Sequence, residues 1–274
     1  MSTTLNYTEA NTYLTNKVNY EALNSSAMLS YKMTIEHLFL IDKKLNKPHQ
    51  NQKIIHVAGT KGKGSVCMLL ENYLRAMGFS TGLFTSPHLY KINERVRING
   101  LELSDPQFAE MINDFRLAIE PADDKNLSYF ETMTFATLLF FKKHQIDWLI
   151  LETGLGGRLD ATNIVNPVLS VITRIDLDHI HLLGNTYTLI ATEKAGIIKE
   201  NTPVVALQQR EDVNQVFEKI CAEKKAPLFF AASSLDMDPI FDKMNSAEIE
   251  NFSIVKEVLK KLNEFSLVAL NENK

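Results

Sequence analysis

A glycine-rich stretch between an apolar run and a helical pattern carries the side chains best suited to chemistry. Residues 59–65 read GTKGKGS, with three glycines, two lysines and a serine. Glycines allow backbone torsions and close approaches that side chains would block, so successive amides can point at phosphate oxygens. Lys63 adds a mobile positive charge, and a helix that begins near Ser65 adds its unpaired N–H groups. The stretch predicts a site for a phosphate group.

Three other strand-like runs end in groups that a Mg-ATP site requires. Glu152 ends one run and is followed by a second glycine-rich turn, and Ser86 follows another run. Ligands of open α/β sheets lie outside the carboxyl ends of the strands, so we expect these segments to meet at the phosphate site. Hydroxyl and carboxylate oxygens suit Mg2+, and imidazole is a less usual ligand. The third run leads into RIDLDHIHLLG, which holds Asp176, Asp178, His179 and His181.

Each of these features also has a plainer interpretation. The spacing of GTKGKGS differs from the common G-x-x-x-x-G-K-[ST], and a glycine-rich turn can be only a tight connection. Ser86-Pro87 can be a turn, and a lone histidine is more often a hydrogen-bonded structural residue. Glu152 can pair with Arg158. Their occurrence together at one edge of a sheet favours a functional site.

Apolar runs alternate with helical patterns along the chain. The runs lie at 53–57, 81–85, 147–153, 168–173, 203–207 and 227–231. The helical patterns lie at 7–17, 27–46, 65–77, 105–119, 130–144, 186–195 and 211–224. This alternation predicts the α/β class, with a doubly wound, mostly parallel sheet and helices on both faces. Asn99-Gly100, between two alternating runs, predicts a small hairpin at the edge.

The composition bounds the partners, the compartment and the number of domains. The 274 residues are 45% hydrophobic, and a net charge of -4 argues against a nucleic-acid or anionic membrane surface, which leaves a small molecule as partner. Cys67 and Cys221 lack metal-like spacing, and the chain shows no secretory signal and no apolar run of membrane-spanning length, so we expect a cytoplasmic protein. One domain is expected over 1–231, followed by a polar connection and a terminal helix over 232–274.

Seven sequence blocks match one family in order and separation. They are HVAGTKGKGSV, FTSPHL, ERVRING, YFE, LETGLGGRLDATN, DLDHIHLLG and EKAGIIK. On these blocks the chain resembles folylpolyglutamate synthase/dihydrofolate synthase of the Mur ligase superfamily over nearly its whole length. The resemblance implies a P-loop NTPase-like central domain and an ATP-dependent amide ligase. A folate or dihydropteroate carboxylate would attack the γ-phosphate of ATP, and the amine of L-glutamate would then displace phosphate from the acyl phosphate.

The same resemblance implies roles for individual residues. It implies that Ser86, Glu152 and His179 hold Mg2+, and that Asn251 approaches the nucleotide. Lys63, His179 and Lys194 would serve catalysis, with Lys194 carbamylated, a modification that needs a lowered pKa. Without the family, Lys194 is only a helix-end lysine favoured by the helix dipole. The residues implied to cradle the ATP phosphates are Gly59, Thr60, Lys61, Gly62, Lys63, Gly64 and Ser65.

The resemblance also implies a pocket for the pterin. In this family the pterin stacks near the segment Tyr129, Phe130 and Glu131. Without the family, Phe130 can equally be a core side chain. The same pocket would be lined by Arg158, Leu159 and Asp160.

The match departs from the family in its last part. Family members continue into a second α/β domain that closes over ATP and holds much of the glutamate site, and we expect this chain to lack that C-terminal domain. Ala247 and Glu248 replace the His and Gln of the family's H-Q-x-x-N, whereas Asn251 matches. The hypotheses are therefore a ligase, alone or completed by a separate chain, and a truncated, non-catalytic remnant that binds Mg-ATP. A Mur-type cell-wall ligase is disfavoured by TSPHL and GLGGRLDATN.

Overall fold

The described residues form one mixed sheet of eight strands. The computed structural model describes residues 4–20, 34–232 and 243–267. The strand order is β4-β3-β2-β5-β1-β6-β7-β8. The strands β2, β5, β1, β6, β7 and β8 pair in parallel with their neighbours. At the edge, β3 pairs antiparallel with both β2 and β4. The strands are β1 (Lys53–Ala58), β2 (Thr81–Phe84), β3 (Val96–Ile98), β4 (Leu101–Glu102), β5 (Trp148–Glu152), β6 (Leu169–Ile172), β7 (Val204–Leu207) and β8 (Leu228–Ala231).

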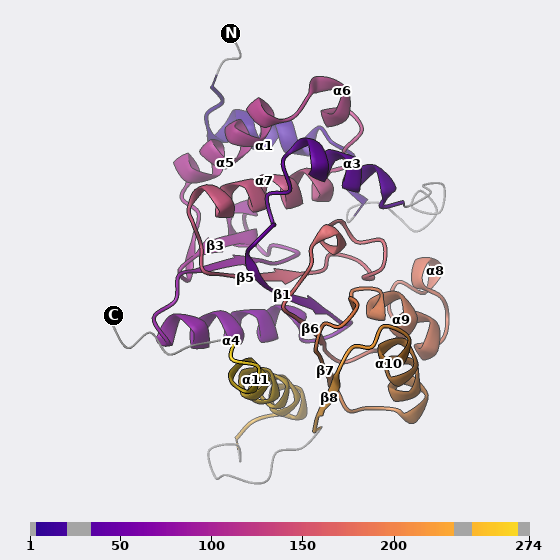
Figure 1. Cartoon of the computed structure of the whole chain (residues 1–274). Helices are drawn as coiled ribbons and strands as arrows, with labels where there is room; N and C mark the ends of the chain where they lie inside the picture. The colour runs from indigo at the N-terminus through magenta and orange to yellow at the C-terminus, as the bar shows by residue number, and fades with distance from the viewer. Residues whose placement is uncertain (1–3, 21–33, 233–242, 268–274) are drawn as a thin grey trace.

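Helices cover both faces of this sheet (Figure 1). Alternate residues of each strand face opposite sides, so Val171 of β6 packs with α4 and α11, whereas Ile172 packs with α9 and α10. The same face as Ile172 is covered farther along by α5 and α7. The predicted doubly wound α/β fold is confirmed. The helices are α1 (Tyr7–Thr15), α3 (Glu36–Lys44), α4 (Lys63–Ala76), α5 (Asp105–Ala118), α6 (Pro121–Asp124), α7 (Tyr129–Lys143), α8 (Ile180–Leu183), α9 (Tyr187–Ala195), α10 (Glu211–Glu223) and α11 (Ser246–Glu264), with 3-10 turns at Ile92–Arg95 and Ala161–Ile164.

The predicted edge hairpin joins β3 to β4. Asn99 and Gly100 have φ of 51° and 78°, the left-handed pair that a tight two-residue hairpin requires. The amide of Gly100 donates to Oε1 of the buried Glu71 at 2.7 Å, which ties the turn to α4. The hairpin is therefore fixed to the helix that follows the glycine-rich loop.

Several predicted boundaries differ from the observed ones. The helix expected from residue 65 begins at Lys63, so part of the glycine-rich stretch is helical. The helix expected over 27–46 is described only as α3, because residues 27–33 lie outside the described residues. In the expected terminal segment 232–274, residues 233–242 and 268–274 also lie outside the described residues.

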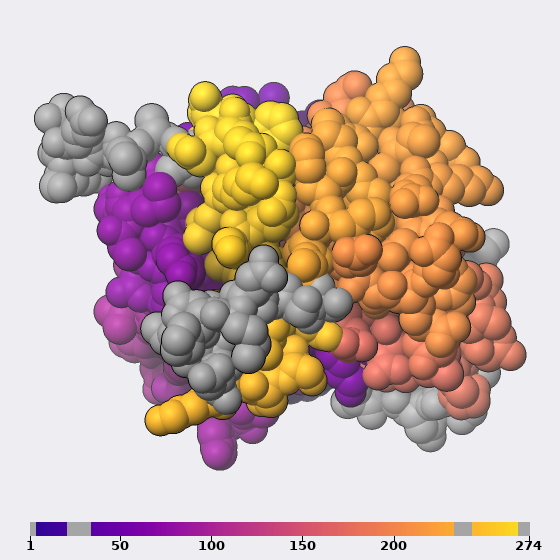
Figure 2. Space-filling view, turned by 90° about the horizontal axis from the view of Figure 1, so that it is seen from below, coloured from indigo at the N-terminus to yellow at the C-terminus, as the bar shows by residue number. Residues whose placement is uncertain are grey.

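α11 packs between α4 and the strands β7 and β8 (Figure 2).

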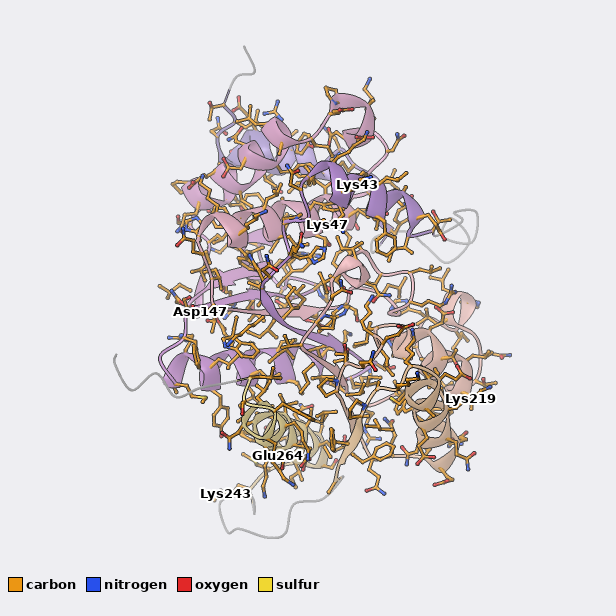
Figure 3. All side chains as sticks on the ribbon, viewed as in Figure 1. Lys43, Lys47, Asp147, Lys219, Lys243 and Glu264 are labelled. Atoms are coloured by element: carbon orange, nitrogen blue, oxygen red, sulfur yellow. The ribbon has the colours of Figure 1, made fainter. Side chains whose placement is uncertain are left out.

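The surface carries charges of both signs. No helix among the described residues is both long enough and apolar enough to span a bilayer. Six exposed charged side chains are labelled in Figure 3: Lys43, Lys47, Asp147, Lys219, Lys243 and Glu264.

Candidate functional site

The glycine-rich loop between β1 and α4 is shaped by two close approaches. A Cβ on Gly59 would lie 1.8 Å from the Thr173 Oγ1, and a Cβ on Gly62 would lie 2.3 Å from the Asn251 Oδ1. Gly62 also has a φ of 85° at the start of α4, a left-handed conformation that favours glycine. These two positions therefore require glycine for packing and, at Gly62, for backbone conformation.

The first amides of the loop are already hydrogen-bonded within the protein. The Thr60 N–H and the Lys61 N–H both donate to the carbonyl of Arg174, at 2.7 and 3.3 Å. The amides of Thr60 and Lys61 therefore shape the loop, whereas the prediction was that successive amides can point at phosphate oxygens. The unpaired N–H groups belong to the first turn of α4, from Gly62 to Ser65, where helix geometry leaves donors without intrahelical partners.

Lys63, Ser86 and Glu152 meet at the carboxyl ends of β1, β2 and β5. The Lys63 Nζ lies 3.7 Å from the Glu152 Oε1, and the Ser86 N–H donates to the Glu152 Oε2 at 3.2 Å. Glu152 is 3% exposed, and this burial raises its pKa to about 7 although Lys63 and the Ser86 amide act in the opposite direction. The alternative pairing of Glu152 with Arg158 is wrong, because Arg158 pairs with Glu193 at 2.9 Å.

His179 makes no direct contact with this cluster among the described residues. It precedes α8 with a φ of 46°, and its half-exposed imidazole is paired with Asp178 at 3.7 Å. It makes no hydrogen bond or ion pair with Ser86 or Glu152. The described residues also contain no group of three or more His, Cys, Asp or Glu side chains arranged to hold a metal. Of the predicted metal ligands, Ser86 and Glu152 are in direct contact, through the Ser86 N–H.

Lys194 is a buried amine near the same edge. It lies in the last turn of α9 and is only 4% exposed. Burial, and next the charge of Lys63, lowers its pKa to about 8, while Asp178 and Asp160 act to raise it. Its ammonium makes no hydrogen bond and no ion pair with any described residue. The burial distinguishes Lys194 from an ordinary solvent-exposed lysine at a helix end.

The second glycine-rich turn is held by a buried polar network. Asp160 accepts from the Leu155 N–H at 2.8 Å and from the Thr162 hydroxyl at 2.5 Å, and burial raises the pKa of Asp160. The Nε2 of His56 donates to the same hydroxyl at 2.8 Å, and burial lowers the pKa of this imidazole to about 3. The predicted pocket residue Asp160 thus supports the turn from within. His56 was missed by the sequence reasoning, because it lies inside a strand and shows no motif.

The segment from Tyr129 to Glu131 begins α7. Tyr129 is buried, and the Arg95 guanidinium lies 5.3 Å from the centre of its ring. Glu131 accepts from the Ser128 N–H at 2.7 Å and pairs with the Nε2 of His37 at 3.1 Å. Both carboxylate oxygens of Glu131 are therefore engaged within the protein.

Phe130 joins α7 to the site edge. Its ring stacks on Phe84, with centroids 5.6 Å apart and planes at 25°, and a Cβ on Gly154 would lie 2.7 Å from it. Half-buried Phe130 therefore lies between the end of β2 and the second glycine-rich turn. In that turn, Arg158 is exposed and Leu159 packs against the core beneath α7.

The comparisons place this arrangement in a known family. Residues 57–259 match the Mur ligase middle domain, which is well over half of the chain. The chain belongs to the Mur ligase family. The dihydrofolate synthase/folylpolyglutamate synthase of Bacillus subtilis is 38% identical over 218 residues, which are 78% of this chain and 50% of that protein.

Solved structures of the family superpose on the chain. An FPGS–AMPPCP–folate complex matches with a TM-score of 0.84 and 27% identity, over 97% of this chain and 69% of that one. E. coli FolC in complex with DHPP and ADP matches with a TM-score of 0.69 and 34% identity, over 82% of this chain and 51% of that one. The chain spans about half the length of the curated relatives that it matches.

Proposed function

We propose that this Mur ligase family chain acts in an ATP-dependent amide ligase that joins L-glutamate to the carboxylate of a folate or of dihydropteroate. One observation carries the proposal. Lys63, Ser86 and Glu152 come from three separate segments and converge beside the first turn of α4. The names of the relatives, and the nucleotide and folate complexes of the structural neighbours, support the same substrates.

The nucleotide would lie along the glycine-rich loop from Gly59 to Ser65. The free N–H groups of the first α4 turn would bind its phosphates, and Lys63 would neutralise the terminal ones. Asn251 reaches the loop at Gly62 and would contact the same ligand. These residues position the γ-phosphorus for attack by the substrate carboxylate. The bond to the bridging oxygen breaks and ADP leaves, and the glutamate amine then forms the amide as phosphate leaves with its oxygen and a proton is lost.

The residues at this edge fit a magnesium ion. Glu152 is a buried carboxylate that accepts from the Ser86 N–H at 3.2 Å and has Lys63 as an ion-pair partner at 3.7 Å. Mg2+ in nucleotide sites takes one or two protein oxygens together with phosphate oxygens. Glu152 and the Ser86 hydroxyl would therefore hold the ion, which would neutralise phosphate charge. His179 is proposed as a further ligand or catalytic group on the family resemblance alone.

Lys194 is proposed to carry a carbamate. Its neutral amine would add CO2, forming an N–C bond and losing a proton, and the buried cation would become an anion. The pterin is proposed to lie near Phe130, whose ring lies beside the second glycine-rich turn, with Tyr129, Glu131, Arg158, Leu159 and Asp160 as its surroundings. The two described cysteines are buried and unpaired, which suits a cytoplasmic location.

Calorimetric titration with Mg-ATP tests the nucleotide site. The purified chain is expected to bind, and Lys63→Ala is expected to abolish binding, whereas the exposed Lys219→Ala on α10 serves as the charge-matched control. Failure of the wild type to bind Mg-ATP would overturn the proposal.

A glutamate-dependent ADP release assay, with dihydropteroate and with tetrahydrofolate, tests the ligase reaction. Turnover would support a ligase. Binding without turnover would support either the non-catalytic remnant or a ligase that needs a separate chain, and adding the second domain of a relative would distinguish these two.

A further inference from the structure

Arg174 contacts the glycine-rich loop and α11 at the same time. It follows β6 by two positions, and its carbonyl accepts both the Thr60 and the Lys61 amides. Its guanidinium meets the carboxylate of Glu250 with two nitrogens, Nε at 2.8 Å from Oε2 and Nη2 at Oε1. One residue therefore holds the start of the loop through its backbone and the first turns of α11 through its side chain.

Glu250 depends on this contact. Its side chain is 7% exposed, and Arg174 is its ion-pair partner among the described residues. A buried carboxylate without a paired cation is strongly unfavourable. The Arg174 side chain is 44% exposed, so the requirement for pairing falls on Glu250 and not on the arginine.

The residue after Glu250, Asn251, reaches the glycine-rich loop. Asn251 places its Oδ1 so close to Gly62 that no Cβ could fit between them. The larger packing contacts of α11 are with α4, β7 and β8, where buried apolar side chains meet. Apolar contacts set which face of the helix is buried without specifying a polar partner. The bidentate pair with Arg174 supplies the directional contact next to Asn251.

The segment around Arg174 is itself held firmly. The Ile175 N–H donates to the Gln209 side chain at 2.8 Å, and the Thr60 hydroxyl donates to the Asp176 carbonyl at 3.2 Å. The anchor for Glu250 is thus built into the edge of the sheet between β6 and β7.

We propose that Arg174 and Glu250 form a positioning pair that sets Asn251 against the glycine-rich loop and thereby determines nucleotide affinity. The proposal rests on the proposed nucleotide-binding function and adds to it two residues that act through Asn251. Glu250 acts as a positioning residue, because its carboxylate is used by Arg174.

A double-mutant cycle tests this pair. Calorimetric titration with AMPPCP and Mg2+ compares the wild type, Glu250→Gln, Asn251→Ala and the double variant. Glu250→Gln keeps the shape of the side chain and is expected to weaken affinity about tenfold, a change of about 1.4 kcal/mol. The double variant is expected to bind no more weakly than Asn251→Ala, since Glu250 acts through Asn251. Glu257→Gln, which alters an ion pair with Lys261 farther along α11, is the matched control and should bind like the wild type.

The outcomes separate the two levels of the proposal. Wild-type protein that fails to bind AMPPCP overturns both the proposed function and the positioning pair. Wild-type binding with an unchanged affinity in Glu250→Gln, or losses that simply add in the double variant, overturns the pair alone. If Glu250→Gln does not fold, Arg174→Lys is used instead, because it keeps the backbone carbonyl and the charge but cannot form the bidentate contact, and an unchanged affinity there overturns the pair.

Discussion

The proposed carbamylation of Lys194 can be tested through the environment of its amine. Burial and the charge of Lys63 lower the pKa of Lys194 to about 8 from its ordinary value of 10.5. At pH 7 a lysine with that pKa is neutral in about one molecule in ten, against about one in three thousand for an ordinary lysine. The reactive neutral amine is therefore roughly 300 times more abundant at this position. Reaction with CO2 should therefore favour Lys194 over lysines whose pKa lies near 10.5.

Carbon-13 NMR of the protein in labelled bicarbonate measures this modification directly. We expect one carbamate resonance at pH 8 and its loss in Lys194→Gln. At a fixed concentration of dissolved CO2, the initial rate should rise between pH 7 and pH 8 and level off above pH 8, as the amine loses its proton.

Lys199 provides the matched control. Burial also lowers its pKa to about 8, but its Nζ donates to the Asn163 carbonyl at 2.8 Å. A carbamate there would face that carbonyl oxygen, so Lys199→Gln should retain the resonance. A resonance that survives in Lys194→Gln and disappears in Lys199→Gln would refute the reasoning, as would the absence of any resonance at pH 8.

Three further predictions concern stability and the loop. Glu152 has a folded pKa of about 7 against 4.5, so the folded state binds the extra proton between these values and stability falls as pH rises through them. In Glu152→Gln the free energy of unfolding, measured in urea, should lose that pH dependence. Relative to the wild type it should rise by on the order of 3 kcal/mol between low pH and pH 8. A pH profile of the variant that runs parallel to that of the wild type would contradict this. Gly62→Ala should cost about 1–2 kcal/mol for its left-handed φ and displace Asn251, seen as lower thermal stability together with weaker AMPPCP binding. Thr162→Val should cost about 1–3 kcal/mol by leaving buried partners unsatisfied, and a change below 0.5 kcal/mol would argue that water replaces the hydroxyl.

The order of apolar runs was sufficient to predict the sheet and the edge that carries the site. Buried parallel strands have a strong local signal, and their carboxyl ends must share one edge. This is why Lys63, Ser86 and Glu152 could be placed together from the sequence. The hairpin at Asn99-Gly100 was equally predictable, because its turn type depends on two adjacent residues.

The contacts made by individual side chains were less predictable. Arg158 pairs with Glu193 and Glu131 with His37, partners that lie 35 and 94 positions away along the chain. The Arg174 carbonyl takes two loop amides that the pattern of glycines suggested were free. Such pairings depend on which loops lie next to each other at the sheet edge. The local periodicity of the sequence contains no information about which loops these are.

The charges at this edge would couple the proposed binding of a nucleotide to the proposed binding of a metal ion. In the described structure Lys63 lies 3.7 Å from Glu152, so the cation expected to bind phosphate is close to the carboxylate expected to bind Mg2+. Burial still holds the pKa of Glu152 at about 7, which means that Lys63 only partly compensates the loss of solvation. A triphosphate would attract Lys63 and leave Glu152 to a divalent cation, and that cation would in turn favour the triphosphate. We therefore expect each ligand to raise the affinity for the other by the same factor, as linkage requires.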